Sequence, residues 1–106
     1  MKLSAILENL ASSADDLCIV ARRPWSADAD ALLVSFTDDF GIPREVMDSG
    51  YEYFLETSTL KDEVLGEWGS AMSIDERTAI AIYYAEHDAW PAWFHADVQQ
   101  RPRGGA

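Results

Sequence analysis

The chain has a single cysteine, Cys18, and no long apolar run. One cysteine excludes an internal disulfide framework and is typical of proteins in a reducing cytoplasm. No apolar stretch approaches the roughly eighteen residues that a membrane-spanning helix needs. The first residues lack the charge and apolar pattern of a signal peptide. We therefore expect a cytoplasmic protein that does not enter a membrane, with Cys18 as a small core residue.

The chain also lacks the short motifs that carry common chemistry. It contains no G-x-S-x-G, no P-loop and no G-x-G-x-x-G, which would indicate a nucleophilic serine or a bound nucleotide. It has no H-E-x-x-H pair of zinc ligands on a helix. We therefore predict no cofactor, no metal and no catalytic residue, and an enzyme is the less favoured interpretation.

Basic side chains are scarce. The sequence has 19 acidic residues against 8 basic ones, a formal net charge of −11 at pH 7. Between residues 28 and 97, sixteen acidic residues stand against three basic ones. Such a surface repels nucleic acid and anionic membranes, and it attracts basic proteins or cations. Solubility alone is the alternative reason for the excess of acid.

The clearest local signal is the stretch 73–90. Ser73 is followed three residues later by Glu76, which is the spacing of a capping box. In this motif each of the two side chains accepts a hydrogen bond from the backbone amide of the other residue. Pro91 disfavours helical conformation at the residue before it. The pattern predicts a helix over 74–88. Its core-facing arc is formed by Ile74, Ile80, Ala81, Tyr84 and Ala85.

Shorter patterns predict the remaining elements, and a hydrophobic content of 48% indicates a folded core. The order α-β-β-α-β-α-α predicts an α+β domain with a small, mainly antiparallel, three-stranded sheet and helices packed on one face. We expect residues 1–98 to form one domain and residues 99–106 a flexible tail. Before the helix at 74–88, we expect helices at 3–12, 43–48 and 60–68 and strands at 17–21, 31–36 and 51–56. A residue within 57–59 should cap the helix at 60–68.

Two aromatic segments carry a resemblance to a known family. They are the strand 50–55, GYEYFL, and the helix end 83–89, YYAEHDA. Together with the N-terminal amphipathic helix and Trp25 in the turn of the first strand pair, they resemble a family of small, uncharacterised bacterial domains. The resemblance covers most of the chain and implies this architecture and a bacterial cytoplasmic origin. That family has no established activity, so the resemblance implies no site residue.

Acidic and aromatic side chains lie together on the third strand and at the end of the last helix. Carboxylates steer association with basic proteins, and Tyr or Trp side chains supply residence time. We therefore hypothesise a non-enzymatic domain that binds a basic protein, most concretely an immunity or antitoxin-type inhibitor of a nuclease-like partner. The candidate contacts are Glu52, Glu56, Tyr83, Glu86, His87, Asp88, Trp90 and Trp93.

Two other functions remain open. One is a DNA mimic from a phage or mobile element, which should space its carboxylates like phosphates over an extended face. The other is a small enzyme or metal-binding protein that uses His87 and His95, two imidazoles separated by a proline and a turn. The sequence also leaves open the oligomeric state and whether residues 90–94 are core or an exposed aromatic patch.

Overall fold

A three-stranded sheet lies at the centre of the protein. The structure is a computed structural model that describes residues 1–39 and 41–101. The strand order is β2-β1-β3, and both outer strands run antiparallel to β1. The predicted α+β class with an antiparallel three-stranded sheet is therefore confirmed. The strands are β1 (Leu17–Ala21), β2 (Ala31–Ser35) and β3 (Glu52–Glu56).

The middle strand, β1, separates two apolar clusters. Its side chains alternate between the two faces of the sheet. Ile19 and Ala21 belong to the main core, whereas Cys18 and Val20 belong to a smaller cluster on the other face. All four are fully buried, so the continuous apolar run of this strand is explained by burial on both sides.

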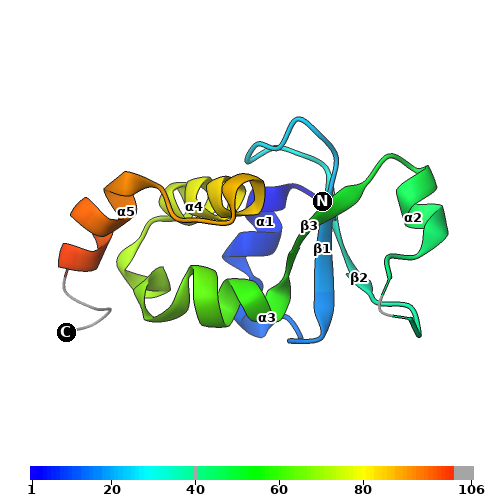
Figure 1. The fold of residues 1–106 in the computed structure, drawn as a ribbon, viewed down its shortest axis with the longest axis horizontal. Helices are drawn as coiled ribbons and strands as arrows, with labels where there is room; N and C mark the ends of the chain where they lie inside the picture. The colour runs from blue at the N-terminus through cyan, green and yellow to red at the C-terminus, as the bar shows by residue number, and fades with distance from the viewer. Residues whose placement is uncertain (40, 102–106) are drawn as a thin grey trace.

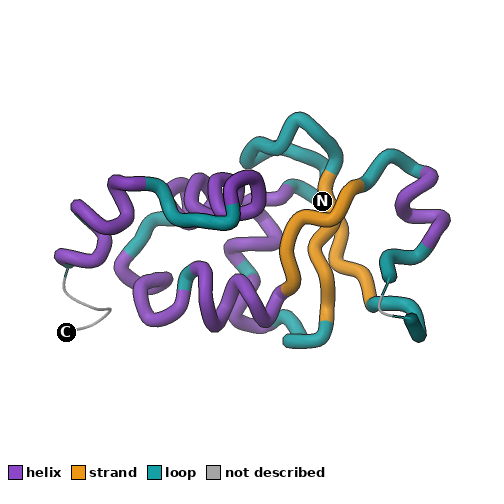
Figure 2. The backbone as a smooth tube through the Cα atoms, viewed as in Figure 1, coloured by secondary structure: helices purple, strands orange, loops and turns teal. Residues whose placement is uncertain are grey.

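Most helices lie on one side of the sheet. Figure 1 shows α1, α3, α4 and α5 on that side and the short α2 beyond the opposite side, and Figure 2 shows the strands between these two groups. Val46 of α2 packs against the smaller apolar cluster. The helices are α1 (Leu3–Glu8), α2 (Arg44–Asp48), α3 (Thr57–Thr59), α4 (Ile74–His87) and α5 (Ala92–Ala96). A π-helical turn spans Leu60–Val64, and 3-10 segments span Leu10–Ser12, Gly66–Ala71 and Val98–Gln100.

The segment after β3 differs from the sequence prediction. We expected residues 57–59 to cap a helix over 60–68, but they form its first turn, and helical structure continues to Ala71. Thr57 is fully buried. Its hydroxyl donates to the carbonyl of Ala14 at 2.7 Å and accepts from the amide of Leu17 at 3.3 Å. The threonine therefore joins α3 to the start of β1 instead of capping its own helix.

Thr57 provides a direct test of this join. Thr57→Val keeps the shape of the side chain but leaves the carbonyl of Ala14 and the amide of Leu17 without this partner. We expect the free energy of unfolding to fall by about 1–3 kcal/mol. Thr57→Ser keeps the hydroxyl and should lose only the contribution of one buried methyl group, about 0.8 kcal/mol. Urea denaturation measures both, and equal losses in the two variants would contradict the role of the hydroxyl.

Helix α4 agrees closely with its prediction. The Ser73 hydroxyl accepts from the amide of Glu76 at 3.2 Å, and the Glu76 carboxylate accepts from the amide of Ser73 at 3.0 Å, so the capping box is confirmed. The helix ends at His87, and Asp88 follows it with a left-handed φ of 55°. All five residues of the predicted arc pack in or against the main core.

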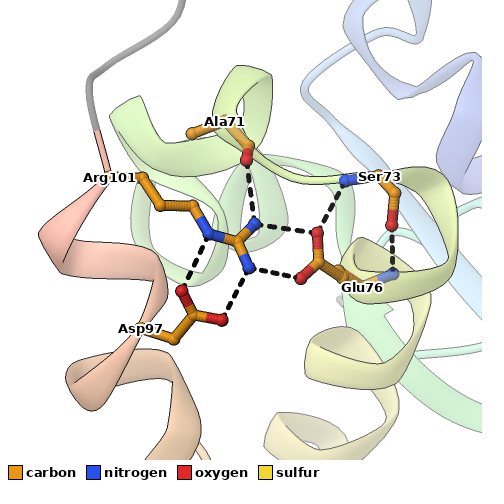
Figure 3. Close-up of polar contacts among 5 residues, drawn as sticks. All are labelled: Ala71, Ser73, Glu76, Asp97 and Arg101. Carbon is orange, nitrogen blue, oxygen red and sulfur yellow. Dashed lines mark hydrogen bonds and ion pairs between the residues drawn. The ribbon is translucent and has the colours of Figure 1, made fainter.

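Glu76 has a second role, shown in Figure 3. The guanidinium of Arg101 donates to both of its carboxylate oxygens, at 2.9 and 2.7 Å. Arg101 also donates to both oxygens of Asp97, at 3.1 and 2.7 Å, and to the carbonyl of Ala71 at 3.1 Å. Paired fork-to-carboxylate bonds of this kind are among the strongest polar contacts in proteins. The network therefore ties the end of the described chain to the start of α4.

This network lies in the segment that we expected to be a flexible tail. Residues 102–106 are outside the described residues. Within the described part, the 3-10 segment extends through Gln100, and Arg101 is bound as above. The structure thus differs from the expectation for residues 99–101. Composition indicated a frayed end because it carries no information about an arginine that pairs with an acid 25 positions earlier.

The pairing makes stability depend on pH. Hydrogen bonds from Arg101 and from the Ser73 amide lower the pKa of Glu76 from 4.5 to about 2. A carboxyl group with a depressed folded pKa stabilises the fold above its unfolded pKa, and this contribution disappears as pH falls from about 4.5 towards about 2. Over that range, the melting temperature of the wild type should fall more steeply than that of Glu76→Gln.

Glu86→Gln, on the same helix, is the matched control, because Glu86 is exposed and has no ion pair among the described residues. Its melting curve should follow that of the wild type as the pH falls. Thermal unfolding followed by circular dichroism measures all three proteins. Parallel pH profiles for Glu76→Gln and the wild type would show that the network contributes nothing to folding.

Candidate functional site

The end of α4 brings together most of the residues that the sequence predicts as partner contacts. Tyr83 and His87 lie one turn apart on this helix, with ring centroids 4.3 Å apart and planes tilted by 41°. Tyr83 is 39% exposed, and His87 is also exposed. After the left-handed Asp88, the chain turns towards α5. An aromatic pair and a helix end therefore share one solvent-facing surface.

Carboxylates from two elements lie beside this helix end. Burial raises the pKa of Tyr84, and the negative charges of Asp88 and Glu63 raise it further. Glu63 belongs to the π-helical turn, which packs against α4, so charges from two elements act on Tyr84. The exposed Glu86 adds a third carboxylate to this end of α4. We call Glu63, Tyr83, Glu86, His87, Asp88 and Trp93 the α4-end surface.

No described basic side chain forms an ion pair with an acid of the α4-end surface. Its carboxylates are therefore not neutralised there. Because the chain carries few cations, their placement decides which acids have a compensating positive charge beside them. The recorded pairs are Lys2–Asp28, Arg22–Asp30, Arg23–Glu52, Lys61–Asp15, and Arg101 with Glu76 and Asp97, together with the N-terminal ammonium and Asp30.

The two tryptophans near the helix end have different environments. The indole of Trp90 donates to the carbonyl of Val64 at 2.8 Å and contacts the ring of Tyr84 edge-on, with centroids 5.1 Å apart. It also stacks on the buried Phe94. Trp93 is 38% exposed. Trp90 therefore supports the surface from below, and Trp93 is the tryptophan that a partner can reach.

Glu52 and Glu56 lie on β3, and their described partners do not belong to α4. The carboxylate of Glu52 forms an ion pair with Arg23 at 3.1 Å. Glu56 lies near Cys18, whose pKa is raised to about 12 by burial and by the charge of Glu56. Glu56 also raises the pKa of Tyr53, after the larger effect of burial. These two acids form a separate group from the α4-end surface.

The histidines and the cysteine have ordinary structural surroundings. His87 lies against the Tyr83 ring, and Nδ1 of His95 is 2.9 Å from the side-chain oxygen of Gln99. In the described part of the chain, no group of three or more His, Cys, Asp or Glu side chains is arranged to hold a metal ion. A buried thiol with a pKa of about 12 is scarcely ionised near neutral pH. These contacts give the enzyme or metal alternative no support.

Sequence reasoning missed Glu63 and Tyr84 as members of this region. Tyr84 was expected only in the core, and it does pack there, while the charges of Asp88 and Glu63 help to raise its pKa. Glu63 lies in a different element from α4, so no local spacing in the sequence could link it to Asp88. The contact between Trp90 and Val64 supplies that link in the fold.

Comparison with known proteins adds no assignment. No family model matches the chain, and neither the curated proteins nor the solved structures contain a match. The resemblance based on segments 50–55 and 83–89 therefore stays a prediction. Within the residues that the structure describes, no helix is long and apolar enough to cross a bilayer.

The different roles of the two tryptophans can be measured. Trp90→Phe removes the indole donor and leaves the carbonyl of Val64 without it, so we expect a loss of about 1–3 kcal/mol in unfolding free energy. Trp93→Phe makes the same replacement at the more exposed tryptophan, which is 38% exposed, and should change stability by about 0.5 kcal/mol or less. Chemical denaturation of both variants checks this order. A larger loss for Trp93→Phe than for Trp90→Phe would contradict the assignment of Trp90 to the core.

Proposed function

We propose that this protein is a non-enzymatic binding domain that recognises a basic protein through the α4-end surface. The observation that carries the proposal is the juxtaposition of exposed acids and exposed aromatic rings. Glu86 and Asp88 have no ion pair with a described basic residue, and Tyr83 and Trp93 lie on the same helix end and the segment that follows. Charge attracts the partner, and the rings provide contact area once it has docked.

The physical roles of the two kinds of side chain are different. Uncompensated carboxylates on a chain of net charge −11 accelerate encounter with a positively charged protein, and salt weakens this effect. Aromatic side chains that become buried at an interface lower the dissociation rate, because their large area leaves water on binding. The α4-end surface combines the two at one place, which favours specific docking over diffuse attraction.

The most concrete partner is a nuclease-like toxin, for which this protein would be the immunity or antitoxin-type inhibitor. The active site of a nuclease is built to hold phosphate groups and is therefore rich in positive charge. A small acidic domain with an exposed carboxylate pair can occupy such a site without any chemistry of its own. The single buried thiol fits a cytoplasmic location for this role. A DNA mimic is less favoured, because the acids are scattered among apolar residues along the sequence, whereas a mimic should space its carboxylates like phosphates over an extended face.

The double variant Glu86→Gln, Asp88→Asn tests the proposal. Asparagine tolerates the left-handed backbone at position 88, so the fold should be unaffected. The control, Glu45→Gln with Asp48→Asn, makes the same charge change on α2, on the other side of the sheet (Figure 1). We expect the wild type and the control to capture the same basic protein from a lysate of the source cells. The α4 variant should bind that protein at least about tenfold more weakly.

Repeating the binding measurement with the purified partner separates steering from contact. The variant should differ from the wild type mainly in association rate at low salt, and the difference should shrink at high salt. Tyr83→Ala and Trp93→Ala should instead raise the dissociation rate. If the α2 control weakens binding as much as the α4 variant does, overall charge alone causes the effect. Unchanged binding by the α4 variant would contradict the proposal.

A further inference from the structure

A groove of about 310 Å³ lies between α4 and the loop that joins β1 to β2. Its lining residues are Ala27 of the loop and Asp75, Thr78, Ala79 and Ile82 of α4. Thr78 is buried, but Ala27, Asp75 and Ala79 are exposed and Ile82 is half-buried. Most of the lining therefore has surface that a group from solvent can touch.

The groove adjoins the α4-end surface along the same helix. Residues four positions apart lie side by side on one face of a helix. Ala79 is therefore next to Tyr83, and Ile82 is next to Glu86, one turn nearer to the start of α4. A protein that docks on the α4-end surface thus meets the groove as the neighbouring part of the same face.

The side chains of the lining indicate what the groove can hold. Three of the five lining residues are alanine or isoleucine, and among the five only Asp75 carries a charge. This carboxylate is exposed and lies in the first turn of α4. In the adjoining loop, the carboxylate of Asp28 is 3.3 Å from the ammonium of Lys2, so that pair adds little net charge. The groove therefore favours a group that is apolar along its length and positive at one end.

We propose that the groove holds one long basic side chain, a lysine or an arginine, of the protein that docks on the α4-end surface. This inference rests on the proposed function and adds the chemistry that the partner must present. Lysine and arginine bury their aliphatic stems along apolar surface and keep the charged head exposed. Asp75 and Ala79 are one turn apart, about 6 Å along the helix axis, which an extended lysine side chain can span. The stem lies on Ala79 and Ile82, and the head lies beside Asp75.

Hexylguanidinium tests the groove without any partner, because it carries a basic head and an aliphatic stem and nothing else. Titration of the ¹⁵N-labelled protein should shift the amide signals of Ala27, Asp75 and Ala79 in a saturable way. Guanidinium lacks the stem and hexanol lacks the charge, so each should bind at least about threefold more weakly. No saturable shift with hexylguanidinium, or equal binding of guanidinium or hexanol, would overturn the proposal.

Two variants of the groove carry the test to the complex. Asp75→Asn removes the charge, and Ala79→Gln fills the groove with an uncharged side chain that suits an exposed helix position. Each should weaken the binding of hexylguanidinium and of the captured basic protein at least about threefold. As controls, Glu45→Gln removes a charge from the first turn of α2, and Ala11→Gln enlarges an exposed alanine outside the groove. Both controls should bind like the wild type.

The groove and the α4-end surface can fail separately. Partner binding that is weakened by Glu86→Gln with Asp88→Asn, but not by Asp75→Asn or Ala79→Gln, would keep the proposed function and overturn the groove as a contact. Native circular dichroism spectra of all variants are required for this comparison. If no basic protein is captured, the proposed function is contradicted, and the hexylguanidinium titration still decides whether the groove accepts a basic side chain.

Discussion

The carboxylate of Glu76 joins two parts of the fold that the sheet does not connect. It accepts a hydrogen bond from the amide of Ser73 at the start of α4, and it accepts two hydrogen bonds from the guanidinium of Arg101 near the end of the described chain. The first contact starts the helix, and the second fixes the segment after α5 against it. Because α4 is a rigid helix of 14 residues, holding its start and packing its apolar side also sets where Asp88 and the α4-end surface lie.

Signals that lie within a few residues of each other were sufficient to predict several elements. The capping box of α4 and the apolar run of β1 both depend on local spacing. The polar contacts that complete the fold do not. The hydroxyl of Thr57 donates a hydrogen bond to the carbonyl of Ala14, and the guanidinium of Arg101 donates to the carboxylate of Glu76. Both pairs are far apart in sequence, so composition and periodicity could not indicate either partner. The same holds for Glu63 in the candidate site.

The scarcity of cations determines which acids of this chain have a compensating positive charge beside them. Most described basic side chains form an ion pair with a nearby acid. The carboxylates of the α4-end surface have no such partner among the described residues, so their negative charge is not compensated locally and favours the approach of a basic protein.

The most direct test of the account is hydrogen exchange of the protein alone and in complex with the basic protein that the proposed function predicts it to capture. Exchange slows where an interface excludes water or restricts local opening. The account predicts slower exchange in the segment from Tyr83 to Trp93 and around Glu63, with α2 and β2 unchanged. Protection confined to α2 and β2, with no change at the end of α4, would show that the partner binds a different face and would contradict the central claim.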